Sequence, residues 1–171
     1  MLASPRARKA LRGWVWCWLV VGTFLPGVGA AQDFAGRVVG ITDGDTIKVL
    51  RESRAETVRL QGVDAPEKRQ AYGERARRFV ADLAFDRTVV VRATGRDRNG
   101  RLLGEVLLPD GRSLNRELVR AGYAWWFRKY SRDVRLARLE EEARQGRRGL
   151  WADHAPEPPT APSAGRRPPL R

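Results

Sequence analysis

Acidic residues occur in three short segments of this sequence, residues 43–46, 59–67 and 96–101, and the second and third segments also contain arginines. Carboxylate oxygens are the ligands that hard cations such as calcium and magnesium select. The planar guanidinium of arginine binds phosphate through paired hydrogen bonds and stabilises the charge that develops at phosphorus during displacement. A cation, a carboxylate that can take a proton from water and two arginines together supply what hydrolysis of a phosphodiester requires.

Each of these segments also has a purely structural explanation. Residues 43–45, Asp-Gly-Asp, form a sequence that hairpin turns commonly use, and residues 64–67 could simply end a strand. Arginine is far more abundant than lysine, so Arg59 and Arg101 could be solvated surface charges. The functional interpretation therefore depends on all three segments lying side by side in the fold.

Histidine and cysteine chemistry is excluded for the central part of the chain. The only cysteine is Cys17, in an apolar run near the start, and the only histidine is His154, in a proline-rich end. A Ser-His-Asp triad, a thiol nucleophile and a histidine-rich zinc site all lack their residues there. The formal net charge of +13 favours a polyanionic partner, with nucleic acid ahead of an anionic membrane or cell-wall polymer.

The two ends of the chain differ in composition from its centre. Residues 1–30 combine four basic residues, an apolar run and a small-residue end at Ala30, which is the layout of a cleaved secretory signal peptide. This predicts a secreted or periplasmic protein; the alternative is a membrane anchor, for which the apolar run is short. Residues 152–171 hold six prolines and predict a disordered tail.

The pattern of residues 31–151 predicts a single domain that is mainly β with helices, of the α+β class. Turn signals and alternating apolar positions predict strands at 34–41, 46–50, 57–63, 87–93 and 102–108. Apolar residues at helical spacing predict helices at 73–85, after Ser113 and at 133–147. On the third strand, alternation places Val58 and Leu60 opposite Arg59 and Val63. Three strands, a helix, two strands and two helices best match a five-stranded OB-type barrel with about three α-helices.

The three segments resemble the signature stretches of the staphylococcal nuclease family. The resemblance rests on residues 43–46, on Arg59-Leu60-x-Gly62-Val63-Asp64-Ala65-Pro66-Glu67 and on Arg98-Asn99-Gly100-Arg101. Leu114-Asn115-x-x-Leu118-Val119-x-x-Gly122 and Gly149-Leu150-Trp151 extend it, so that it spans about Arg37 to Trp151 in the right order. It implies a calcium-dependent nuclease that cuts DNA or RNA to a 3′-phosphate and a 5′-hydroxyl.

The resemblance also implies a role for particular residues. Asp45 and Asp64 match the carboxylates that bind calcium, and the backbone carbonyl of Ala65 completes the site where the family usually has threonine. Arg59 and Arg101 match the two arginines that bind the scissile phosphate. Glu67 matches the catalytic glutamate, which acts as general base or orients the attacking water.

The sequence departs from the family at the substrate groove. Asn99 stands where a tyrosine helps to hold the 5′-phosphate in the prototype, and a second such tyrosine has no clear counterpart in residues 124–130. We predict that Arg98 and Asn99 contact the substrate and that Arg128 or Tyr130 supplies the missing 5′-phosphate contact. Cations beside aromatic rings are typical of surfaces that bind single strands.

Two other functions compete with the nuclease interpretation. One is a non-catalytic OB-type module that binds nucleic acid, like the nuclease-like repeats of Tudor-containing proteins. The presence of all five polar residues of the family's site argues against it: Asp45, Arg59, Asp64, Glu67 and Arg101. The other is a basic structural protein of the cell envelope, which only the proline-rich end supports. No protein partner is implied, and we expect a monomer; a membrane is a partner only if the N-terminal segment is not cleaved.

Overall fold

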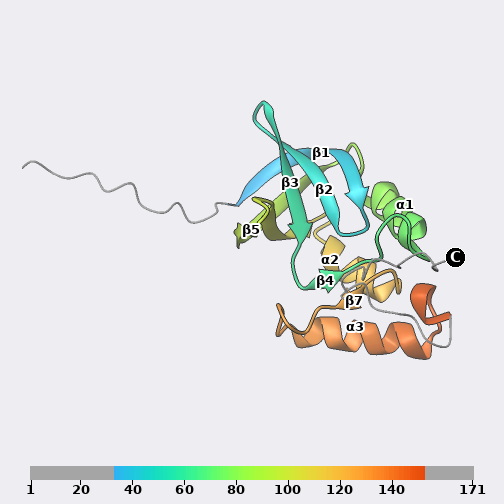
Figure 1. Ribbon diagram of the computed structural model, residues 1–171. Helices are drawn as coiled ribbons and strands as arrows, with labels where there is room; N and C mark the ends of the chain where they lie inside the picture. Colours follow the sequence, from blue (N-terminus) through green and yellow to red (C-terminus); the bar gives the residue numbers. More distant parts are fainter. Residues whose placement is uncertain (1–32, 153–171) are drawn as a thin grey trace, which may run out of the picture.

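Five strands close into a barrel within residues 33–152, the part of the chain that the computed structural model describes (Figure 1). Around the barrel the strands follow the order β1-β2-β3-β6-β5. Their bounds are Phe34–Asp43 for β1, Thr46–Arg51 for β2, Arg54–Leu60 for β3, Thr88–Arg96 for β5 and Leu102–Leu107 for β6. The predicted OB-type α+β barrel is confirmed.

The first three strands form the predicted antiparallel meander, and β5 pairs antiparallel with both β1 and β6. In the β2–β3 pair, Thr46 lies opposite Arg59. The barrel is closed by parallel pairing of β3 with β6, in which Arg59 lies opposite Leu103. This parallel pair joins strands that are far apart in the sequence. It places residues 97–101, which precede β6, beside the end of β3.

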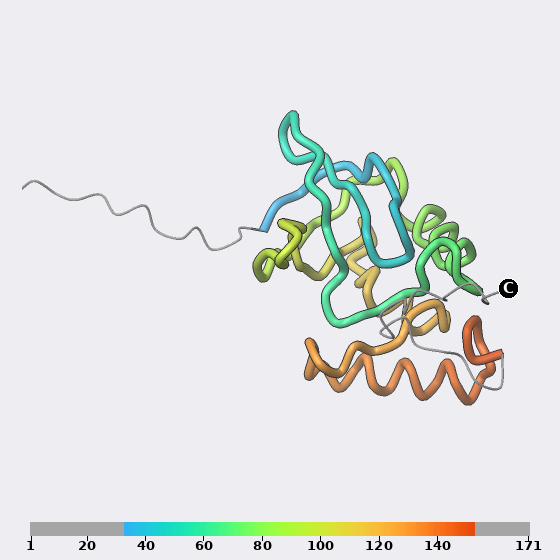
Figure 2. The backbone as a smooth tube through the Cα atoms, in the orientation of Figure 1, coloured from blue at the N-terminus to red at the C-terminus, as the bar shows by residue number. Residues whose placement is uncertain are grey.

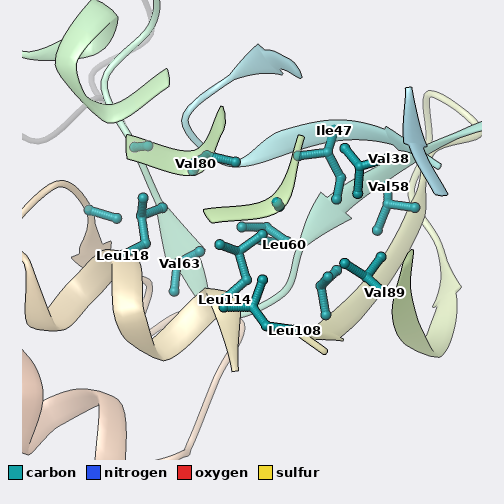
Figure 3. Close-up of a cluster of buried hydrophobic side chains, with 14 of the residues drawn as sticks. Val38, Ile47, Val58, Leu60, Val63, Val80, Val89, Leu108, Leu114 and Leu118 are labelled. Atoms are coloured by element: carbon teal, nitrogen blue, oxygen red, sulfur yellow. The ribbon is translucent and has the colours of Figure 1, made fainter. Parts of the chain in front are cut away.

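Two helices complete the core of the barrel. Helix α1 (Gly73–Ala84) and helix α2 (Leu114–Arg120) contribute Val80, Leu114 and Leu118, and all three side chains are fully buried. They meet inward-facing side chains of the strands, including Val38, Ile47, Val58, Leu60 and Val89 (Figure 3). Burial of one such side chain stabilises the fold by about 1.5–3 kcal/mol. The core therefore holds the strand ends that carry the acidic residues and arginines.

The third predicted strand is interrupted, contrary to expectation. Strand β3 ends at Leu60, and the chain then turns through Gly62, whose φ of 77° is in the left-handed region that favours glycine. It resumes as β4 (Val63–Asp64), where Val63 is 1% exposed. Val63 was predicted on the same face as Arg59. The turn resets the alternation and sends Val63 into the core instead.

A two-stranded ribbon and a helix lie below the barrel in Figure 1. Strand β7 (Trp125–Trp126) pairs with β4, and α3 (Val134–Gln145) runs beside β7 at the lower edge of the molecule (Figures 1 and 2). A short 3-10 helix, Gly149–Ala152, follows α3. Within residues 33–152 no helix is both long and apolar enough to cross a membrane. The predicted signal peptide and most of the predicted tail lie outside the described residues.

Candidate active site

Asp45 is held just before β2 by hydrogen bonds from two neighbours. Its side chain is 2% exposed, and its Oδ1 accepts a hydrogen bond from Thr46 Oγ1 at 3.0 Å. Its Oδ2 accepts from the backbone N–H of Ala65 at 2.8 Å, which ties the first hairpin to the chain after β4. The approach requires glycine at position 44, because a Cβ there would lie 2.7 Å from the Cβ of Ala76 and 2.9 Å from that of Ala65.

Arg59 lies between the two aspartates that were predicted to bind metal. Its Nη1 forms an ion pair with Asp45, and its Nη2 donates to Asp64 Oδ1 at 2.7 Å. Burial alone would lower the pKa of the Arg59 guanidinium, but the two carboxylates outweigh this effect and raise it. Arg59 therefore stays charged and holds both carboxylates against its guanidinium.

Asp64 is a buried carboxyl with two other carboxylates near it. Desolvation by burial raises the pKa of its carboxyl, the charges of Asp45 and Glu67 raise it further, and the hydrogen bond from Arg59 only partly opposes them. Three carboxylates and one guanidinium leave a local charge of 1 − 3 = −2. A divalent cation would neutralise this charge.

Glu67 is exposed, while its backbone is fixed. Its N–H donates to Gln70 Oε1 at 2.6 Å, and its carbonyl accepts from the N–H of Gln70 at 2.7 Å. Gly73 packs against the same carbonyl so closely that a Cβ would lie 1.9 Å from the oxygen. The anchored backbone keeps the carboxylate near Asp64 and open to water, which is the environment that a general base needs.

Arg101 is positioned by the turn that precedes β6. Asp97 Oδ2 accepts from Arg101 Nε at 2.7 Å, and Asp97 Oδ1 accepts from the N–H groups of Asn99 and Arg101, both at 2.9 Å. Burial raises the pKa of the Asp97 carboxyl, but these hydrogen bonds outweigh burial and hold the pKa below its ordinary value. The arginine is 34% exposed and keeps donors free for a ligand.

A groove of about 670 Å³ joins the two arginines. Four cations and one acid line it, so it favours an anionic ligand. Among its lining residues are Arg59, Arg98, Asn99, Arg101, Lys129 and Tyr130. The acidic cluster of Asp45, Asp64 and Glu67 adjoins this groove through Arg59, and the backbone of Ala65 contacts Asp45 within it.

The structure separates the two residues that were predicted to replace the missing tyrosines. Tyr130 is 59% exposed, lines the groove and packs edge-on against Phe127, with 4.7 Å between ring centroids. Arg128 does not line the groove; its Nη2 donates to Glu140 at 2.7 Å and its guanidinium lies 4.8 Å from the Trp126 ring centroid. The contact with the 5′-phosphate stays a prediction, and the geometry favours Tyr130 for it.

Glu140 is a buried carboxylate whose role the sequence analysis missed. It is 2% exposed, and its Oε1 accepts from the backbone N–H of Trp126 at 3.1 Å. Its Oε2 pairs with Arg128 Nη2 at 2.7 Å and, one turn further along the helix, with Arg144 Nη2 at 3.4 Å. Its burial could have been predicted from the sequence, because it lies four residues after Leu136 and therefore on the apolar face of the helix. Glu140 thus fastens α3 to β7, the partner of the strand that carries Asp64.

We expect Glu140→Ala to lower the free energy of unfolding by about 2–3 kcal/mol, because hydrogen bonds to a buried charged group are lost. Glu140→Gln loses less, since its amide oxygen still accepts from Trp126. Urea denaturation of both variants measures the difference. Glu141→Ala, at an exposed neighbour on the same helix, is the control and should stay within about 0.5 kcal/mol of the wild type. Equal stability of all three variants would contradict this role.

The donors at the acidic cluster suit a hard cation. Within residues 33–152 no group of three or more histidine, cysteine, aspartate or glutamate side chains is placed to hold a metal ion. Asp45 and Asp64 nevertheless both contact the guanidinium of Arg59, and carboxylate oxygens keep lone pairs beyond the hydrogen bonds they accept. With the carbonyl of Ala65 and water, they would make the all-oxygen site that calcium accepts.

A small barrel that carries carboxylates and two arginines at a basic groove has the kinds of residue that a nuclease requires. The sequence model of the family described as staphylococcal nuclease homologue matches residues 57–153, more than half of the chain. The match includes Arg59, Asp64, Glu67 and Arg101 and begins after Asp45. The chain therefore belongs to the staphylococcal nuclease homologue family.

Curated relatives resemble the chain over most of their length. A protein of Escherichia coli O157:H7 named uncharacterized endonuclease is 47% identical over 127 residues, which cover 74% of this chain and 83% of that protein. The micrococcal nuclease of Shigella flexneri is 44% identical over 142 residues, which cover 77% of this chain and 82% of that protein. A protein of Haemophilus influenzae named uncharacterized endonuclease is 38% identical over 125 residues, which cover 72% of this chain and 70% of that protein.

Proposed function

We propose that this chain is a calcium-dependent nuclease that hydrolyses phosphodiester bonds in DNA or RNA and releases 3′-phosphate products. The observation that carries the proposal is the placement of Arg59 between Asp45 and Asp64 at the edge of a basic groove. This arrangement combines a site for a cation with donors for a phosphate. The similarity to proteins named as nucleases supports the same activity.

The residues divide the reaction between them. Arg59 and Arg101 bind the oxygens of the scissile phosphate and stabilise the charge of the transition state. Glu67 takes a proton from the attacking water, whose oxygen forms the new bond to phosphorus. The bond to the 5′ oxygen breaks, and that oxygen takes up a proton to leave as a hydroxyl. When calcium is bound at Asp45, Asp64 and the carbonyl of Ala65, it supplies a Lewis acid for a phosphoryl oxygen.

A chelator should abolish hydrolysis of single-stranded DNA and of RNA, and added calcium should restore it. Magnesium should restore far less, because it demands a stricter octahedral geometry than two carboxylates and a carbonyl offer. Release of acid-soluble nucleotide measures both effects, and circular dichroism in chelator serves as the control for folding. Full hydrolysis in chelator would refute the calcium assignment but not the nuclease assignment.

A binding module without catalysis is the second candidate, because basic OB-type barrels bind nucleic acid through their grooves. It predicts tight binding with no hydrolysis under any metal condition. The exposed Glu67 beside Asp64 favours the enzyme, since a groove that only binds phosphate gains nothing from an added negative charge.

Export is also part of the proposal. The basic and apolar pattern of residues 1–30 supports a secreted or periplasmic nuclease, with an N-terminal membrane anchor as the alternative. Mass spectrometry of the protein from culture medium, periplasm and membrane would distinguish a chain that starts after Ala30 from an uncleaved one.

A further inference from the structure

A second hollow, here called the side groove, adjoins the basic groove of the candidate active site. It has a volume of about 420 Å³, which is within the range of pockets that hold small ligands. Gln61 and Tyr130 line both hollows and form the boundary between them. Gln61 is held in place there, since its Oε1 accepts a hydrogen bond from Thr94 Oγ1 at 2.9 Å. The two hollows are therefore neighbours on the surface, separated only by these two residues.

The side groove carries more positive than negative charge. Three arginines line it, Arg92 on β5, Arg116 on α2 and Arg132 before α3, against the two acids Glu105 and Asp133. The net lining charge is 3 − 2 = +1, and it adds to the cations of the first groove. An anionic chain that leaves the scissile position thus meets further positive charge in the side groove.

The pairing of these arginines leaves donors for a ligand. Among residues 33–152, Arg132 is exposed and makes no ion pair, and Arg92 reaches Glu105 only at 3.7 Å. Arg116 pairs with Glu105 at 3.2 Å and with Asp133 at 3.4 Å, yet its buried Nε has no hydrogen-bond partner. This nitrogen is enclosed by the protein, so the donors that a ligand can reach are those of the exposed Arg92 and Arg132.

We infer that the side groove is a binding subsite for the phosphates of a single nucleic acid strand, beyond the nucleotides at the scissile bond. The inference rests on the proposed nuclease function. Arg92 and Arg132 contact the backbone, and Tyr130 at the boundary offers a ring on which a base can stack. Thr94 and Asn115 also line the groove, but their side chains already form hydrogen bonds within the protein, so the arginines supply the contacts with the strand and those contacts go to its phosphates.

The test compares the binding of a 4-nucleotide and a 12-nucleotide oligothymidylate, followed by fluorescence anisotropy in chelator so that no hydrolysis occurs. Arg92→Ala/Arg132→Ala should weaken binding of the longer strand on the order of tenfold and leave binding of the shorter one nearly unchanged. For the longer strand, loss of two phosphate contacts should also make the slope of log binding constant against log salt concentration shallower by about 1.4.

The matched control removes the same charge elsewhere. Arg54→Ala/Arg87→Ala takes two exposed arginines from the β2–β3 hairpin, which projects away from α3, and from the turn before β5 (Figure 1). It should not change the ratio of the two affinities. An equal loss for both strand lengths in the Arg92/Arg132 variant, or no loss, would overturn the inference. A wild type that binds with this length dependence but cleaves neither oligonucleotide with calcium would refute the nuclease function and leave the subsite standing.

Discussion

Glu67→Gln should lower turnover by about 10²–10⁴-fold while substrate affinity stays close to that of the wild type. Glutamine keeps the shape of the side chain but cannot take a proton from water. The Glu67 carboxylate is exposed and its loop is held by backbone contacts with Gln70 and Gly73, so the fold should not depend on the charge. Steady-state hydrolysis and binding in chelator measure the two effects separately.

The control for this variant is Glu52→Gln, which removes the same charge from the exposed β2–β3 turn. It should leave turnover unchanged. If Glu67→Gln hydrolyses DNA as fast as the wild type, the carboxylate is not the base, and the chain's activity needs another proton acceptor. If neither protein hydrolyses DNA under any condition, the binding-module function gains support.

Replacing Arg59 by alanine should reduce both catalysis and stability, whereas replacing Arg101 should reduce catalysis alone. Each change should raise the barrier by about 3–4 kcal/mol, because one donor to the transition-state charge is lost. Arg59 is 18% exposed and neutralises Asp45 and Asp64, so its loss leaves two buried carboxylates facing each other. Arg101 is more exposed, and its partner Asp97 keeps the hydrogen bonds from two backbone N–H groups.

Kinetics and thermal unfolding of both variants, with and without calcium, test this division. Calcium should raise the unfolding temperature of Arg59→Ala more than that of Arg101→Ala, because the cation neutralises the charge that Arg59 otherwise balances. Equal stability of the two variants in chelator would contradict the structural role of Arg59. An unchanged turnover in either variant would remove that arginine from the reaction.

Much of the architecture was determined by local sequence pattern. Alternating apolar residues defined the barrel strands, and helical spacing defined α1 and α3, because side-chain periodicity depends only on the backbone of each element. The chemistry could also be derived in outline. Without histidine or cysteine in the central part of the chain, only carboxylates, arginines and oxygen ligands remained, and the family resemblance then assigned roles to Asp45, Arg59, Asp64 and Glu67.

The tertiary structure decided how these residues meet. The parallel pairing of β3 with β6 joins Arg59 to the turn of Arg101, and no local pattern specifies which distant strands pair. The left-handed turn at Gly62 redirected Val63 into the core, because one backbone angle reverses the alternation that a continuous strand would keep. Glu140 resembled a surface charge until its packing against β7 buried it. Side-chain burial and strand pairing depend on neighbours that are distant in the chain, so only the tertiary structure could show them.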